Sequence, residues 1–278
     1  MLERPCVAVS KEKLFLKLGL HRSLLIHVIT ARIRSSEVRL HRSSENSILW
    51  IPACAALSLA LIATALWFWG ATEVRGETGP VTGLTFVGGF WLVLAYALFP
   101  WLGLSLRDDA VDRRNPAALV ALGCALPSVA ITFAAGNLGE GPSYWENIFS
   151  AGLATGGLFG LWVLVELGSH VSISIAEEWD FASGVRFGGL LLAWGLILGR
   201  AATGNWHSCT ATVIDFGRDG WAALILCLAG LLVELGLRPS RTRPFPSWFS
   251  CGLVPAFLYL LAAGLWLWHL GKWEGMPT

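Results

Sequence analysis

Charged residues are scarce in this chain. Asp, Glu, Lys and Arg together make up only 14% of its 278 residues, whereas about a quarter of a typical soluble domain is charged. Hydrophobic residues make up 55%, so the chain lacks the polar side chains that would cover a water-exposed globule. Its net charge of +1 argues against a nucleic-acid partner. The composition therefore predicts a protein whose partner is the lipid bilayer.

The chain also lacks the short motifs that carry catalysis, cofactors or structural metals. No Walker loop, nucleophile elbow, HExxH motif or dinucleotide fingerprint is present. The six cysteines are scattered and none forms a CxxC pair. His207 and Cys209 form one His-x-Cys pair, which is a weak metal signal because a closed zinc site needs four ligands. We therefore expect no enzyme activity, no cofactor and no metal site.

Long apolar runs are what the chain has instead. Each is about 20 residues or slightly longer, the length that a helix needs to cross about 30 Å of hydrocarbon. Isolated strands cannot satisfy their backbone polar groups in lipid. We therefore expect an all-α, polytopic integral membrane protein of about seven transmembrane helices. The runs cover residues 48–70, 83–106, 116–136, 147–169, 186–204, 220–238 and 248–270.

Basic residues are concentrated in the N-terminal tail, residues 1–47. This segment mixes Lys and Arg with apolar residues, so it is either disordered or a short amphipathic helix on the membrane surface. Basic residues favour the cytoplasmic side of a membrane. We therefore expect a cytoplasmic N-terminus and, after seven spans, a C-terminal tail at 271–278 on the periplasmic or extracellular side.

The sequence LVELG occurs twice, at 164–168 and at 232–236, which is an offset of 68 residues. Asn137 and Asn205 share this offset, as do Asp112 and Asp180. Several matches at one offset predict an internal duplication. We expect a leading helix at 48–70 followed by parallel two-helix repeat units, each with an inward helix, a cytoplasmic turn and an outward helix. The units are 83–136, 147–204 and a diverged copy at 220–270.

Two stretches of these units carry a family resemblance. The stretch DRRNPAALVALGCALPSVAITFAAGN and its counterpart EEWDFASGVRFGGLLLAWGLILGRAATGNW place small residues at the start of an outward helix. They resemble the repeated unit of the YjfL-like bacterial membrane proteins, domain-of-unknown-function family 350. The resemblance implies a helical inner-membrane protein, and the family has no established activity to carry over. The residues that carry it are Asn115, Ala117, Ala118, Gly123, Gly184, Gly188 and Gly189.

Glu166 and Glu234, one in each LVELG copy, are the main candidate functional residues. An acid inside a membrane span is a functional hypothesis, such as a proton relay or a cation site. It is also compatible with a structural ion pair, with Arg238 or with an arginine of a neighbouring helix, or with a side chain that snorkels to the headgroups. We favour the structural interpretations and keep the ion or proton path as the alternative.

Arg200 is the third candidate, near the outer end of its helix. It either reaches the lipid headgroups, which we favour, or pairs with Asp215 or Asp219 across the outer loop.

Two acidic turns lie at matching places on the cytoplasmic side. Their carboxylates either bind a divalent cation or a basic partner, or serve as helix caps. We favour capping, by Asp112 and Asp180, which come just before the next helices. The acidic residues are Asp108, Asp109, Asp112, Glu177, Glu178 and Asp180.

Together these features predict a non-enzymatic membrane component that acts in interaction or assembly. Small residues spaced along the helices allow close helix contacts, so the expected partner is a second copy (a homo-oligomer) or another membrane protein. The alternative is a small transporter or channel, with a polar path that involves Glu166, Glu234 and Arg200.

Overall fold

The computed structural model describes residues 50–140, 144–204, 208–239 and 246–272. The chain divides into two units, Met1–Arg42 and Ser43–Thr278, and all of the described residues belong to the second. The predicted basic tail at 1–47 and most of the C-terminal tail at 271–278 therefore lie outside the described residues, as does His207.

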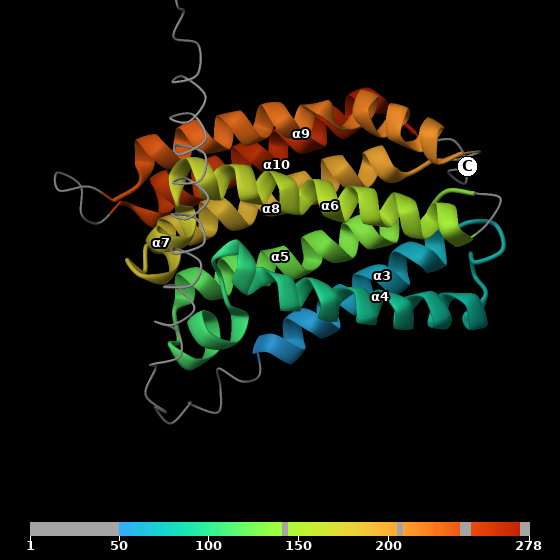
Figure 1. The fold of residues 1–278 in the computed structure, drawn as a ribbon, viewed down its shortest axis with the longest axis horizontal. Helices are drawn as coiled ribbons and strands as arrows, with labels where there is room; N and C mark the ends of the chain where they lie inside the picture. Colours follow the sequence, from blue (N-terminus) through green and yellow to red (C-terminus); the bar gives the residue numbers. More distant parts are fainter. Residues whose placement is uncertain (1–49, 141–143, 205–207, 240–245, 273–278) are drawn as a thin grey trace, which may run out of the picture. The chain divides into compact units, whose positions relative to one another are not determined.

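Every regular element in the described ranges is helical, and Figure 1 shows the long helices side by side. Of the short elements, η1 is a 3-10 helix and η2 and η3 are π-helical. In chain order the elements are α3 (Trp50–Trp69), α4 (Thr78–Leu98), η1 (Phe99–Leu102), η2 (Leu106–Asp112), α5 (Pro116–Ala135), α6 (Tyr144–Ser169), α7 (Val171–Ala176), α8 (Phe181–Ala202), α9 (Cys209–Leu237), η3 (Trp248–Leu253) and α10 (Val254–Leu270).

Seven helices in this part of the chain are long and apolar enough to cross a membrane. The prediction of an all-α chain with seven such helices is confirmed. The largest departure from the predicted runs is at α9, which begins at Cys209 although its apolar run begins at 220. The part of α9 before residue 220 contains Asp215, Arg218 and Asp219, which interrupt the hydropathy pattern but are paired with one another or with Arg200.

The core lies between α5 and α8, which are 72% and 78% buried, whereas α3 and α4 are only 17% and 22% buried. Small residues bring these two helices together. A Cβ atom added to Gly184 would lie 2.7 Å from the Cα of Ala117, so only glycine permits this approach. Helix α8 also contacts α6, α9 and α10. The helix that carries Arg186 and Arg200 is therefore the centre of the bundle.

The turns before α5 and α8 share one backbone pattern. In each turn, two backbone N–H groups donate to carbonyls earlier in the chain. The residue that caps the next helix donates to the carbonyl six positions back, and the residue two before it donates to the carbonyl five positions back. The residue between these two donors has a left-handed backbone, with φ 57° at both Arg114 and Trp179. Matching residues lie 65 positions apart, not 68, so the turns and the LVELG copies do not share one offset. The donors are Arg113 and Asn115 in the first turn, and Glu178 and Asp180 in the second.

Candidate functional site

A buried ion pair joins α8 to α9. The Nε and Nη2 atoms of Arg186 donate to the two carboxylate oxygens of Glu234 at 2.8 and 2.6 Å. The two side chains are 0% and 3% exposed. This two-bond geometry suits the planar guanidinium, which presents two parallel donors to a carboxylate. Glu234 therefore has an arginine of a neighbouring helix as its partner.

Arg186 also binds two other parts of the fold. Its Nη2 donates to Ser183 Oγ at 2.9 Å, and Ser183 Oγ donates in turn to Asp180 at 2.6 Å. Its Nη1 donates to the backbone carbonyl of Cys251, in the π-helical turn η3. One guanidinium thus connects the start of α8, the end of α9 and the turn that leads into α10. We call Arg186, Glu234, Ser183 and Asp180, with the Cys251 carbonyl, the inner polar cluster.

The hydroxyl of Tyr259, in α10, is buried and has no hydrogen-bond partner among the described residues. It belongs to the same helix bundle as the inner polar cluster but is not bonded to it. The polar atoms of Arg186 and Glu234, in contrast, bind each other and fixed backbone or hydroxyl groups. Buried charges are stable only when they are paired and hydrogen-bonded. The arrangement of the cluster is therefore that of a structural link between helices.

Glu166 has a different role from Glu234, although each lies in an LVELG copy. Its carboxylate accepts hydrogen bonds from the backbone N–H of Ser172 at 3.0 Å and from the Ser172 hydroxyl at 2.6 Å. The chain reverses here through His170, which has a left-handed φ of 52°. Glu166 therefore holds the junction of α6 and α7 together.

Arg200 lies next to Asp219, one of the two acidic partners that the sequence offers for it. Its Nη1 lies 3.9 Å from Asp219 Oδ2, and the two side chains are 11% and 17% exposed. Asp215 pairs instead with Arg218 at 3.3 Å. The indole N–H of Trp266 donates to the Asp219 backbone carbonyl at 2.9 Å, which links α10 to α9 at this residue. Arg200 is therefore mostly buried, beside a carboxylate that α9 supplies.

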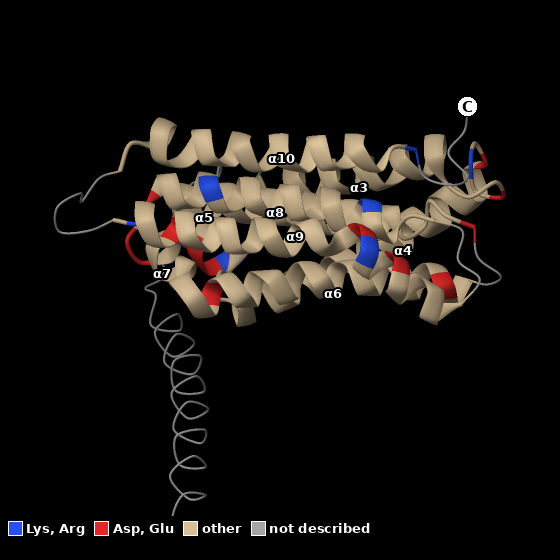
Figure 2. Cartoon of the chain, turned by 90° about the horizontal axis from the view of Figure 1, so that it is seen from above, with Lys and Arg blue, Asp and Glu red and all other residues tan. Residues whose placement is uncertain are grey.

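The three predicted residues do not form one site. Arg186 and Arg200 are about four helical turns apart on α8, or roughly 21 Å at 1.5 Å per residue. Figure 2 shows charged residues gathered toward the two ends of the helices. The α8 residues between the two arginines include Leu190, Trp194 and Ile197, which are apolar and buried. The structure therefore separates Arg200 from the inner polar cluster by a layer of packed apolar side chains.

The acidic turns are partly caps, as expected. Asp180 accepts from the backbone N–H groups of Ala182 and Ser183 at 3.2 and 3.0 Å and so caps α8. Asp112 does not cap α5, which begins four residues later, and its carboxylate lies 4.0 Å from Arg107. That cap is Asn115, which accepts from the N–H groups of Ala117 and Ala118 at 2.9 and 3.3 Å. An Asn followed by Pro at a helix start is the sequence signal that points to Asn115.

Asn115 also connects the two turns. Its side-chain amide donates to the carbonyl of Ile175 at 2.6 Å, near the end of α7. Arg113 reinforces this contact: its Nη1 donates to Ala176 O at 3.4 Å and to Asp109 at 3.2 Å. Burial raises the pKa of Asp109, while the Ser105 N–H and Arg113 act in the opposite direction. The side chains of the first acidic turn are therefore used to hold the second turn in place.

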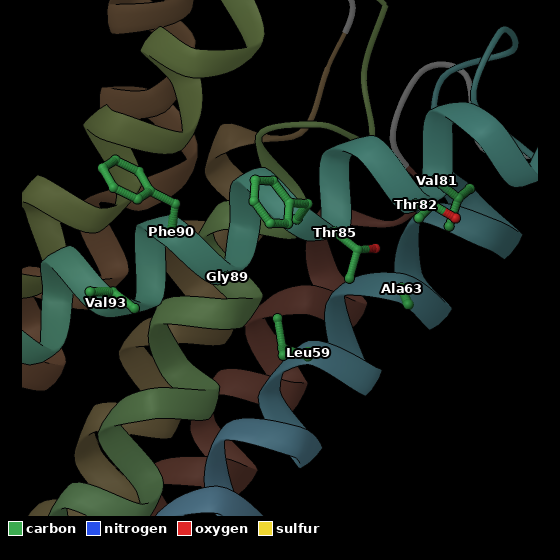
Figure 3. A pocket seen from close by; sticks show the side chains of 9 residues that line it. Leu59, Ala63, Val81, Thr82, Thr85, Gly89, Phe90 and Val93 are labelled. Atoms are coloured by element: carbon green, nitrogen blue, oxygen red, sulfur yellow. The ribbon is translucent and has the colours of Figure 1, made fainter.

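Metal ligation finds no support in the described ranges, where no group of three His, Cys, Asp or Glu residues could hold an ion. A groove with a volume of about 620 Å³ lies between α3 and α4 (Figure 3). It is lined by apolar residues such as Leu59 and Phe90, with Thr82 and Thr85, and contains none of the candidate charges.

Comparison of the chain with protein-family models, with curated proteins and with solved structures finds no match. The resemblance to YjfL-like proteins stays a prediction.

Arg186 is the site residue that the sequence pattern did not identify. It lies at the edge of an apolar run, so it was grouped with the basic residues of the cytoplasmic segments. The signal was indirect: a glutamate in a membrane span needs a partner.

Proposed function

We propose that this chain is a non-enzymatic, multi-pass membrane protein that acts as an interaction or assembly component. The observation that carries the proposal is that each candidate charged side chain is bonded to a partner within the fold. Glu234 binds Arg186, Glu166 binds Ser172, and Arg200 binds Asp219. A transport path needs polar groups that can release one partner and take up a substrate, whereas these groups fix helices to one another.

The position of the charges favours the same proposal over a transporter or channel. The inner polar cluster and the Arg200–Asp219 pair lie toward opposite ends of α8, with buried apolar residues between them. Moving an ion between the two would require its transfer through packed hydrocarbon, which is costly. The geometry therefore favours a scaffold over a conduit.

We further propose that the seven apolar helices are inserted in the inner membrane of a bacterial cell, with a cytoplasmic N-terminus and a periplasmic C-terminus. The end of the bundle that holds α7 and the inner polar cluster is then cytoplasmic. A reporter fused after Thr278 should be active in the periplasm, and activity on the cytoplasmic side would contradict this orientation.

The duplication of a two-helix unit is part of the same proposal. Its support is the shared backbone pattern of the two turns, including the left-handed residues Arg114 and Trp179. The third unit, at 220–270, has its connecting turn largely outside the described residues, so it rests on the LVELG copy and on helix order.

Reconstituted vesicles test the proposed function. Vesicles that contain the chain should show no more proton or cation flux than empty vesicles, as read by an internal pH- or ion-sensitive dye. A flux that is lost in Glu166→Gln and Glu234→Gln, and kept in the surface control Glu178→Gln, would establish the transport alternative instead.

A further inference from the structure

Arg200 is a mostly buried cation that makes few hydrogen bonds. Its side chain is 11% exposed. Its Nη1 atom lies 3.4 Å from Thr203 Oγ1 and 3.9 Å from Asp219 Oδ2, both longer than the usual distance of about 2.7–3.2 Å. Its Nε atom is buried and has no hydrogen-bond partner among the described residues. Its Nη2 atom likewise donates to no group in this part of the chain.

The Nε edge of Arg200 is the edge with which other arginines of this chain bind acceptors. In a guanidinium, Nε and Nη2 present two parallel N–H donors on one side, which we call the two-donor edge. In Arg186 this edge holds both carboxylate oxygens of Glu234, at 2.8 and 2.6 Å. In Arg75, between α3 and α4, Nε donates to the Gly70 carbonyl at 3.2 Å. A buried donor without an acceptor is costly, so the two-donor edge of Arg200 points to an acceptor from outside the described chain.

Asp219 does not supply that acceptor. Its Oδ1 atom accepts a hydrogen bond from Arg218 Nε at 3.1 Å, whereas its Oδ2 atom stays 3.9 Å from Arg200. Arg218 also lies 3.3 Å from Asp215. The carboxylate nearest to Arg200 is therefore bonded more closely to another arginine, and Arg200 keeps positive charge for a ligand. Because these two carboxylates lie at the same end of the bundle, a singly charged anion is favoured over a doubly charged one.

The surroundings of Arg200 are those of a membrane–water interface. Arg200 lies two residues before α8 ends, at Ala202. The ring of Trp266, whose N–H donates to the Asp219 carbonyl, packs edge to face against Trp221 with the centroids 5.1 Å apart. Tryptophans near the ends of membrane spans gather at the level of the lipid headgroups. The anion that this level supplies is phosphate, and arginine is well suited to bind it.

We propose that Arg200 binds a phosphate group through its Nε and Nη2 atoms. A phosphate presents two oxygens to the two-donor edge, as the carboxylate of Glu234 does in Arg186. The group belongs either to the headgroup of a phospholipid or to free phosphate, and the chemistry of the contact is the same for both. This ligand site goes beyond the proposed function, because it lies toward the opposite end of α8 from the inner polar cluster.

Thermal unfolding tests the site on the full chain, delipidated in a maltoside detergent that carries no phosphate. The probes are a short-chain phosphatidylglycerol and the diacylglycerol with the same acyl chains. A ligand that binds the folded state raises Tm until the site is saturated. We expect the phospholipid to raise Tm to a plateau and the diacylglycerol to have little effect. Equal shifts from the two probes would show that the acyl chains bind and would overturn the proposal.

Sodium phosphate separates the two sources of the group. Its effect on Tm is compared with that of sodium chloride at the same ionic strength. A saturating shift with sodium phosphate identifies free phosphate as a ligand, and a shift with the phospholipid alone identifies the headgroup. Either result supports the site, and no shift with either probe overturns it.

Substitution by lysine tests whether the two-donor edge makes the contact. Arg200→Lys keeps the positive charge but removes the paired donors. We expect the apparent affinity for the phospholipid to fall about tenfold, the effect of losing one charge-assisted hydrogen bond. The matched control is Arg75→Lys, which should bind like the wild type because Arg75 Nε is already bonded to Gly70.

Unchanged affinity in Arg200→Lys, or an equal loss in both variants, would contradict the role of Arg200. The comparison of probes on the wild-type chain does not depend on how the variants fold.

Discussion

Arg186 and Glu234 join α8 and α9 through two parallel hydrogen bonds of 2.8 and 2.6 Å, and both side chains are buried. Arg200 and Asp219 join the same two helices near their other ends, at 3.9 Å. The antiparallel register of α8 and α9 is thus fixed at two places about four helical turns apart. The first pair is fully desolvated, so its loss should be the more costly.

Breaking the inner pair should destabilise the fold strongly. Arg186→Met leaves the Glu234 carboxylate buried without its counter-charge, and such a loss typically costs about 3–5 kcal/mol. We expect a large decrease in the free energy of unfolding, measured by SDS titration in mixed micelles with tryptophan fluorescence.

The double variant Arg186→Met with Glu234→Leu should recover much of this loss, because no uncompensated charge remains. Arg200→Met is the control at the looser pair and should cost less than Arg186→Met. If Arg186→Met behaves like wild type, the inner pair does not hold α8 to α9.

The cap of α5 should depend on Asn115 and not on Asp112. Asn115→Ala removes the acceptor for two N–H groups and also the donor to the Ile175 carbonyl. Loss of an N-cap costs about 0.5–2 kcal/mol, and the orphaned carbonyl adds to it. Asp112→Ala removes only an exposed contact and should leave the free energy of unfolding almost unchanged. Equal effects of the two substitutions would show that Asn115 does not cap the helix.

The same substitution at two helix glycines should have opposite effects. In Gly184→Ala the new Cβ meets the backbone of Ala117 at 2.7 Å, so α5 and α8 must separate, at a cost of about 1–3 kcal/mol. In Gly156→Ala, in α6, the new Cβ meets nothing within 4 Å. That variant should gain about 0.5–1 kcal/mol from alanine's higher helix propensity. Thermal unfolding in detergent measures both, and a neutral Gly184→Ala would contradict the close approach.

Asp109 should make stability depend on pH in a defined direction. Its pKa is raised by burial in the folded chain, so above about 3.9, the ordinary value, the folded state holds more of this proton than the unfolded state. Its contribution to stability is therefore fully present below that value and is lost as the pH rises through the raised pKa. Asp109→Asn should remove this part of the pH dependence. The difference between the two unfolding curves from pH 4 to 7 measures it, and parallel curves would count against the shift.

The hydropathy of the sequence was enough to predict seven apolar helices and the helix ends at which Glu166 and Glu234 lie. Both depend on local composition, because a span must be long and apolar whatever it packs against. The cap of α8 by Asp180 could also be predicted from the sequence, because a capping side chain bonds backbone N–H groups within three residues of itself.

The partners of the charges could not be read in the same way. Arg186 and Glu234 are far apart in the chain, and only the packing of α8 against α9 brings them into contact. The same holds for Arg200, which only the packing of α8 against α9 brings beside Asp219. The sequence by itself therefore determined which segments are helices and where charge is costly. The tertiary structure decided which groups neutralise that charge, because the pairing free energy depends on distances set by helices that are not neighbours in sequence.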